Sequence, residues 1–276
     1  MTLIAITLAT LAAGIGSVWL AALLMRLGLG DRRDSVGPQH LLSLAAGALL
    51  ATAFMHLLPE AFEGPASAHD LFATLLVGLV FFFLLDKAEL WHHGHEHSHA
   101  GHGHDHGHEH GHGHDHSHHG HDHHAPRSGG WAVLTGDSVH CFGDGVLIAS
   151  AFMADTRLGV VAALSVLAHE VPHHIGDLVV LRHSTRHRNA ALLKVSLAGA
   201  LTALGGLVGY YLVGLWDGGL PYFLAIASSS FVYVALADLI PQLQKRLSAA
   251  QTLAQIAWLA AGIAVVTFVS GLAHAH

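Results

Sequence analysis

Two short stretches of this sequence carry histidine and acidic side chains at helical spacing. Residues 136–145 read GDSVHCFGDG, and residues 169–177 read HEVPHHIGD. Imidazole nitrogens and carboxylate oxygens are the ligands that zinc and related divalent transition metals accept in proteins. The two stretches therefore predict a site for a divalent metal ion.

Helical geometry predicts which of these side chains share a face. At 100° per residue, His140 and Asp144 lie about 40° apart on the first stretch. On the second, an arc of about 100° holds His169, His173, Asp177 and Glu170, with His174 just outside it at roughly 140°. Two antiparallel helices could turn these faces toward each other. The result would be a cage for one ion, or for two ions that share Asp144 and His173.

Both stretches lie inside apolar runs, where each ionisable group costs roughly a few kcal/mol in a membrane and usually marks a pathway or site. Hydrogen bonding between helices would explain one or two such groups but not a cluster. We therefore expect metal ligands at His140, Asp144, His169, Glu170 and His173. Further pathway candidates are His56, Glu60, Asp137, His174 and Asp177. For His56 and Glu60, an entry role and plain interfacial solvation are equally open.

The composition points to a membrane protein. Of 276 residues, 52% are hydrophobic and 11% are charged, whereas soluble domains carry about 25% charged residues. Apolar runs of about 20 residues, the length that spans a bilayer, cover 3–25, 41–59, 71–90, 131–154, 158–181, 195–216, 220–240 and 252–272. Since strand-like alternation is absent, we expect an all-α polytopic protein with eight transmembrane helices.

The chain divides by composition into four parts. Residues 1–91 hold the first three helices, 131–181 the two metal-site helices, and 182–276 the last three. Between them, residues 92–130 contain a tract at 92–124 that alternates histidine with glycine and acids, which predicts a disordered segment that handles metal. An internal and irregular tract of this kind does not resemble an affinity tag.

The basic residues predict the orientation. With eight spans, every lysine and arginine except Arg157 falls on one side of the membrane, which identifies that side as cytoplasmic. Both termini are then outside, the histidine-rich loop is cytoplasmic, and the first apolar run is a retained helix. The only cysteine, Cys141, excludes an intrachain disulfide.

One internal echo suggests a repeated architecture. Residues 56–60 read HLLPE at the end of the second span, and residues 238–242 read DLIPQ at the end of the seventh. These are the middle helices of the first and last triplets, and the predicted topology runs them in opposite directions. This pattern is typical of inverted repeats around a midplane site.

The sequence resembles the ZIP (Zrt-, Irt-like) metal transporters, in the branch with a histidine-rich loop between spans three and four. HLLPEA at 56–61, HCFGDG at 140–145 and HEVPHHIGD at 169–177 carry the resemblance. It implies a 3+2+3 bundle with inverted repeats and uptake of zinc into the cytosol without ATP, with Fe²⁺, Mn²⁺ and Cd²⁺ as other substrates. The family's metal centre would map onto His140, Cys141, Asp144, His169, Glu170 and His173, with two sub-sites that share Asp144 and His173.

Three residues depart from that family pattern. Cys141 stands where asparagine is usual, which supplies a softer ligand. His174 replaces a common acidic residue, and Gln242 replaces another at the end of span seven.

Other function classes stay open on the residues alone. HEVPH at 169–173 is also an H-E-x-x-H motif, in which two histidines bind zinc and glutamate activates water, so an intramembrane metalloprotease is one alternative. A cation-diffusion-facilitator exporter is another, although such proteins have six spans. A receptor that senses metal is a third. We expect a transporter rather than an enzyme, in a bacterial inner membrane. Its partners are divalent metal ions and lipid, not nucleic acid, and a homodimer is one option for its assembly.

Overall fold

A computed structural model describes residues 2–28, 36–94, 129–184, 188–216, 218–244 and 248–274, and every element in these ranges is a helix. Most of the predicted histidine-rich loop, residues 95–128, lies outside the described residues. The all-α architecture expected from the sequence is confirmed.

Eight long helices follow one another in the described part of the chain, and three contain a wider π-helical turn. The uninterrupted helices are α5 (Ala68–Gly94), α6 (Gly129–Ala154), α7 (Thr156–Ser184), α8 (Arg188–Leu215) and α11 (Ala249–His274). The first helix comprises α1 (Thr2–Leu11), η1 (Ala12–Gly16) and α2 (Ser17–Arg26). The second comprises α3 (Val36–Thr52), η2 (Ala53–Leu57) and α4 (Leu58–Glu63). The seventh comprises α9 (Leu220–Tyr233), η4 (Val234–Leu239) and α10 (Ile240–Leu243).

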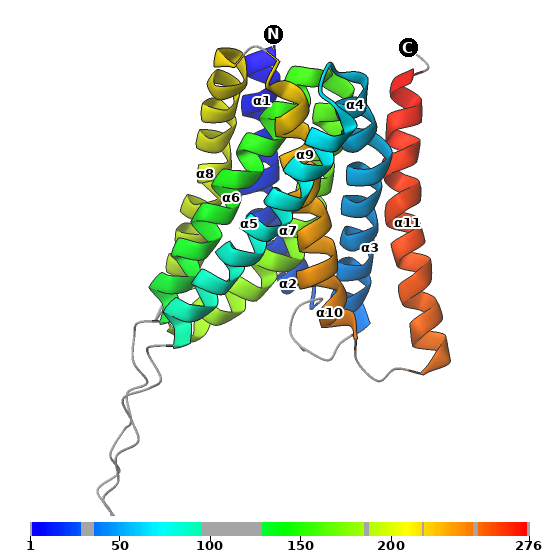
Figure 1. Ribbon diagram of the computed structural model, residues 1–276. Coiled ribbons are helices and arrows are strands. Elements are labelled where there is room, and N and C mark those ends of the chain that lie inside the picture. Colours follow the sequence, from blue (N-terminus) through cyan, green and yellow to red (C-terminus); the bar gives the residue numbers. More distant parts are fainter. Residues whose placement is uncertain are drawn as a thin grey trace, which may run out of the picture.

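The bundle has the end-to-end arrangement of a protein with an even number of crossings. Figure 1 shows that α1 begins at the end of the bundle where α11 finishes, while α5 finishes and α6 begins at the opposite end. Seven of the described helices are long and apolar enough to cross a membrane by composition. The remaining one, α6, falls short because it carries Asp137, His140 and Asp144. With 26 residues it is about 39 Å long, more than the ~30 Å of a bilayer core.

Paired features in the first and last three helices agree with the predicted inverted repeat. In the second and seventh helices, a π-helical turn directly precedes the segment that contains Pro59 or Pro241. The next helix in each case starts with a serine cap, Ser67 for α5 and Ser248 for α11, which bonds the backbone N–H three residues ahead. The packing also matches, because α3 lies against α11 and α9 lies against α5.

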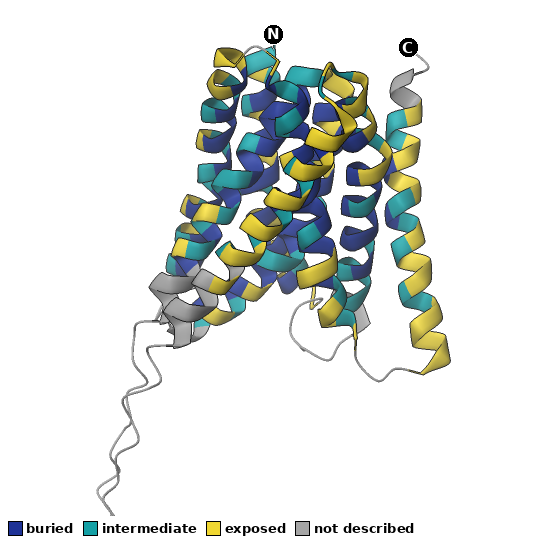
Figure 2. Ribbon diagram, viewed as in Figure 1, coloured by how far each residue is buried: buried dark blue, intermediate teal, exposed yellow. Residues whose placement is uncertain are grey.

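The helix α6 is held in place mainly by α8, and glycine makes the close approach possible. A Cβ atom on Gly145 would collide with the backbone carbonyl of Thr202, and one on Gly205 would collide with that of Phe142. Small residues at such crossings are typical of membrane helices, whose backbones must approach closely to pack. Figure 2 shows the resulting distribution: the bundle centre is buried, whereas α5 and α11 are largely exposed.

Candidate metal centre

A single residue, Asp155, joins α6 to α7 and makes them antiparallel neighbours. Its Oδ1 accepts hydrogen bonds from the backbone N–H groups of Arg157 (2.8 Å) and Leu158 (3.3 Å), which caps the first turn of α7. Because α7 begins one residue after this short link, the two polar stretches lie side by side in the bundle.

The first cluster of ligand atoms, here called the first position, consists of His140, Asp144, His169 and Glu170. The Nε2 atoms of the two histidines are 3.3 Å apart. The His169 Nε2 is 3.1 Å from Asp144 Oδ2, and the His140 Nε2 is 3.2 Å from Glu170 Oε1. Ligands about 2.0–2.1 Å from a tetrahedral zinc ion stand about 3.3–3.4 Å from one another. The spacing therefore suits one zinc ion without a large rearrangement.

A backbone carbonyl on the same helix fixes the orientation of the His169 ring. Its Nδ1 is 3.2 Å from the backbone carbonyl of Ser165. A carbonyl oxygen only accepts, so Nδ1 carries the proton, and in the neutral ring Nε2 presents its lone pair to Asp144 and His140. The Ser165 hydroxyl is in turn 2.5 Å from that of Thr52 on α3. Such outer contacts hold metal-ligating histidines in the required tautomer and orientation.

A second cluster, here called the second position, consists of Asp137, Cys141, Glu170 and His174. Glu170 belongs to both positions. Its Oε1 faces the first position, whereas its Oε2 lies 3.1 Å from His174 Nε2 and 3.6 Å from Cys141 Sγ. The carboxylate of Glu170 therefore has the geometry of a bridge between two ions.

A third cluster continues the series toward the end of the bundle where α6 begins. Its members are Asp137, His173 and Asp177. The His173 Nδ1 is 3.8 Å from Asp137 Oδ1 and 4.0 Å from Asp177 Oδ2. With 38% of its side chain exposed, His173 is more accessible than either carboxylate. Adjacent clusters thus share one residue: Glu170 between the first and second, and Asp137 between the second and third.

The structure brings His140, Asp144, His169 and Glu170 together as the sequence predicted, but it divides the histidines of the second stretch differently. His173 faces Asp137 and Asp177, although its ring centroid is only 5.4 Å from that of His140. His174, expected just outside the site, is fully buried. The helical-wheel argument considered only one face of α6 and one face of α7. Residues 137 and 141 on α6, and 170 and 174 on α7, also have i, i+4 spacing, and these two pairs form the second position.

The pathway candidates on the second helix lie outside these clusters. His56 belongs to η2, and its Nδ1 is 3.5 Å from the Ser270 hydroxyl on α11. Glu60 lies on α4 and is half-buried. A role of His56 and Glu60 in metal entry stays a prediction.

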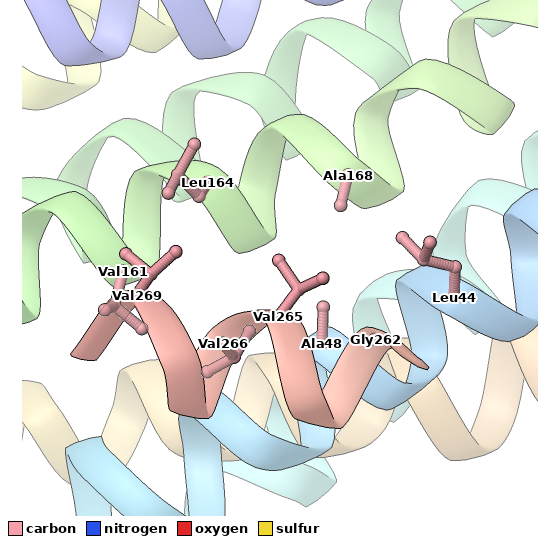
Figure 3. Close-up of a pocket in the computed structure, with 9 residues that line it drawn as sticks. All are labelled: Leu44, Ala48, Val161, Leu164, Ala168, Gly262, Val265, Val266 and Val269. Carbon is pink, nitrogen blue, oxygen red and sulfur yellow. The ribbon is translucent and has the colours of Figure 1, made fainter. Parts of the chain in front are cut away.

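One pocket in the described part of the bundle is apolar and holds no metal ligand. It lies between α3, α7 and α11 (Figure 3). Its lining is Leu44, Ala48, Val161, Leu164, Ala168, Gly262, Val265, Val266 and Val269. None of these side chains offers nitrogen, oxygen or sulfur to an ion, so this pocket is not a metal site.

The arrangement differs from that of a zinc protease. In the H-E-x-x-H motif both histidines bind one ion and the glutamate activates water. Here His169 and His173 belong to different clusters. Glu170 is fully buried among three histidines and a cysteine, whereas a catalytic zinc site keeps an open coordination position.

Known proteins resemble this chain over much of its length. Mouse zinc transporter ZIP4 is 40% identical over 111 residues, which are 40% of this chain and 17% of that protein. Rat zinc transporter SLC39A7 is 32% identical over 155 residues, 53% of this chain and 33% of that protein. Zinc transporter ZIP13 of Pongo abelii is 27% identical over 260 residues, 86% of this chain and 69% of that protein. The chain thus spans less than a fifth of ZIP4 and a third of SLC39A7.

The family comparison covers more of the chain than any of these pairs. A family model described as ZIP zinc transporter matches residues 1–270. This range includes all the described helices in full except α11, whose last residues lie beyond it. This family consists of transporters, so the protease and the cation-diffusion-facilitator alternatives do not hold. Fold, polar clusters and family match lead to one conclusion: the chain belongs to the ZIP zinc transporter family.

Proposed function

We propose that this chain carries zinc across its membrane into the cytosol through the clusters on α6 and α7. The observation that carries the proposal is the first position, where His140, Asp144, His169 and Glu170 converge inside a membrane bundle. Asp144 Oδ2 and Glu170 Oε1 are buried without a hydrogen bond and face the Nε2 atoms of His169 and His140, at 3.1 and 3.2 Å. Charged groups left in this way are costly in a bilayer, and a divalent cation supplies the missing partner.

The sharing of residues between clusters supports movement as well as binding. An ion that leaves the first position keeps Glu170 as a ligand in the second, and one that leaves the second keeps Asp137 in the third. Each step therefore exchanges some ligands while another stays bound, which avoids a bare ion in an apolar medium. The proposal includes a preference for zinc over iron, manganese and cadmium. This preference needs its own measurement, because the ligand types alone do not determine which of these ions binds best.

The proposed orientation places the termini outside and the end where α5 finishes in the cytoplasm. Arg26, Lys87 and Arg182 lie near the ends of the first, third and fifth helices, and Lys194 lies near the start of the sixth, in agreement with the distribution of basic residues in membrane proteins. The histidine-rich loop then receives or senses metal on the cytosolic side, and the membrane is a bacterial inner membrane. A homodimer stays an expectation.

Thiol labelling tests the proposed orientation. Ser67→Cys, in a chain that also carries Cys141→Ser, should react with a membrane-impermeant thiol reagent in intact cells.

Zinc flux into proteoliposomes tests the proposed function. The purified chain should fill vesicles with zinc in a way that depends on an inward gradient. Glu170→Gln, which keeps the shape and removes the charge, should lower this flux by more than the about 10–100-fold that loss of an outer-shell contact costs. His169→Ala should have a similar effect, because it removes a ligand of the first position.

His69→Ala is the matched control. This histidine lies in the first turn of α5 with 92% of its side chain exposed, and its loss should leave the flux unchanged. Equal flux through wild type and Glu170→Gln would exclude the α6–α7 clusters as the route. No flux in any of the proteins, despite bound zinc, would contradict transport itself.

A further inference from the structure

The apolar pocket between α3, α7 and α11, here called the apolar crevice, has a buried floor and an open rim. On the floor, Ala48, Val161 and Val266 are 4%, 3% and 4% exposed. On the rim, Leu164 and Val265 are 41% and 53% exposed. Figure 3 shows Leu164 of α7 on one side of the space and Val265 of α11 on the other. The crevice has a volume of about 50 Å³ and opens at the surface of the bundle.

The crevice exists because α11 packs more closely on α3 than on α7. A Cβ atom on Gly262 of α11 would collide with the backbone carbonyl of Leu44 on α3. The glycines of α7 make no such approach to α11. Gly159 faces Phe152, and a Cβ on Gly176 would meet no described atom within 4 Å. Side chains therefore hold α7 and α11 apart, and where these are small they leave the space open.

The lining of the crevice selects hydrocarbon over water. Its side chains are those of leucine, valine and alanine, with one glycine, and none carries a polar atom. A water molecule needs about two to four polar partners to stay in such a space. An empty space forfeits the dispersion contacts of its walls. Hydrocarbon from the bilayer restores these contacts without a desolvation cost, because lipid chains are as apolar as the lining.

The depth and direction of the crevice fit an acyl chain. Along α7 the lining extends from Val161 to Ala168, a distance of about 10 Å at 1.5 Å per residue. The candidate span of α7 begins at Thr156, so the crevice lies roughly 8–18 Å from that end, inside a hydrocarbon core of about 30 Å. Acyl chains and spanning helices both run across the membrane. An elongated apolar crevice that follows a helix at this depth therefore has the shape of a lipid tail.

We propose that the apolar crevice binds a single acyl chain of a membrane lipid, which reaches the floor between α3, α7 and α11. The chain then forms part of the wall that supports the metal helix, because Ala168 in the lining directly precedes His169 of the first position. Occupancy requires only that these helices lie in a bilayer, so it is independent of zinc transport.

Photo-crosslinking of the full-length chain in lipid nanodiscs tests this site. The probe is a phosphatidylethanolamine with a diazirine in the middle of one acyl chain, diluted into ordinary phosphatidylethanolamine. On illumination the diazirine loses N₂, and the resulting carbene inserts into a C–H bond of the side chain that it touches. Mass spectrometry should find adducts on Val161 and Val266, which surface lipid does not reach, and on the exposed Leu76 of α5. The same lipid with the diazirine in its head group should label neither floor residue.

Substitutions at the rim separate a chain in the crevice from general labelling. Val265→Trp and Leu164→Trp each place a large ring at the mouth, from opposite walls, and each should abolish the floor adducts while Leu76 stays labelled. Because the two variants alter different helices, misfolding of one leaves the other as a test. Val265→Ala keeps the mouth open and should retain the floor adducts. Ile256→Trp is the matched control, since this residue of α11 is 58% exposed and does not line the crevice; its floor adducts should equal those of wild type.

Three results would overturn the lipid site. The first is a wild type in which Leu76 is labelled and the floor residues are not, which would mean that no acyl chain enters the crevice. The second is equal floor labelling in wild type, Val265→Trp and Leu164→Trp, which would mean that the probe reaches the floor by another route. The third is floor labelling that disappears when two chains share a nanodisc, which would assign the crevice to a second copy of the chain.

Discussion

The helices α7 and α5 have similar lengths, 29 and 27 residues, but opposite surroundings. Of the seven candidate spans, α7 is the least apolar and α5 the most apolar. Yet 61% of the residues in the apolar window of α7 are buried, against 11% in α5. A soluble protein would bury the more apolar helix. Here the polar helix is enclosed, because lipid is a good solvent for leucine and phenylalanine and a poor one for histidine and glutamate.

This inversion explains how the metal clusters come to lie at the centre. Apolar helices gain little by leaving lipid, so they are tolerated in either place: α5 and α11 have 11% of their apolar windows buried, whereas the equally apolar second and seventh helices have 61% buried. The polar stretches of α6 and α7 gain most by facing each other. The glycines between α6 and α8, and the packing of α7 on α2 and α3, then complete the enclosure.

A charge on the peripheral helix α5 should have the largest effect among the substitutions that test the contrast between α5 and α7. Leu76 lies midway along the apolar part of α5 and is 62% exposed. Leu76→Asp should destabilise the inserted protein by about 2.5–3.5 kcal/mol, the cost of an aspartate at the centre of a spanning helix. The measurement is the yield of membrane-inserted protein together with SDS-induced unfolding followed by tryptophan fluorescence. A fully stable Leu76→Asp protein would mean that α5 is covered by another chain.

A smaller effect should come from the contact that keeps α11 against the bundle. A Cβ on Gly262 would collide with the backbone carbonyl of Leu44 on α3, whereas one on Gly271 of the same helix meets nothing. Gly262→Val should therefore destabilise the protein by about 1–3 kcal/mol, the usual cost of overpacking. Gly271→Val is the matched control and should change the unfolding midpoint little. Equal effects of the two substitutions would show that α11 is held by lipid alone.

Most of the fold can be predicted from the sequence, because the length and apolar composition of membrane helices identify them. All eight predicted apolar runs match long helices in the described part of the chain, and the similar sequences at Pro59 and Pro241 each follow a π-helical turn. The π-helical turns themselves were not predicted. Proline alone does not determine them, because the first helix contains such a turn without a proline and α7 contains Pro172 without such a turn.

The site was less completely predictable. His140, Asp144, His169 and Glu170 share faces that a helical wheel identifies, and the structure brings them together. The wheel cannot state how α6 and α7 are rotated or which third helix covers them. His174 therefore looked peripheral, whereas the contact with Ser17, 157 positions earlier in the chain, places it inside. Contacts of that range depend on packing of the whole bundle.

The smallest expected effect separates lipid from protein as the neighbour of a leucine. Leu76→Ala, on the exposed face of α5, should change stability by less than about 0.5 kcal/mol, because acyl chains fill the space that the side chain leaves. Leu49 on α3 is 0% exposed, and its truncation leaves a cavity that rigid helices cannot close. Leu49→Ala should cost about 2 kcal/mol, the low end of values from soluble cores. The transfer from water that raises those values is missing in a bilayer. A loss of about 4 kcal/mol or more in SDS unfolding would mean that the unfolded state leaves the apolar phase. The contrast between α5 and α7 would then need a different explanation.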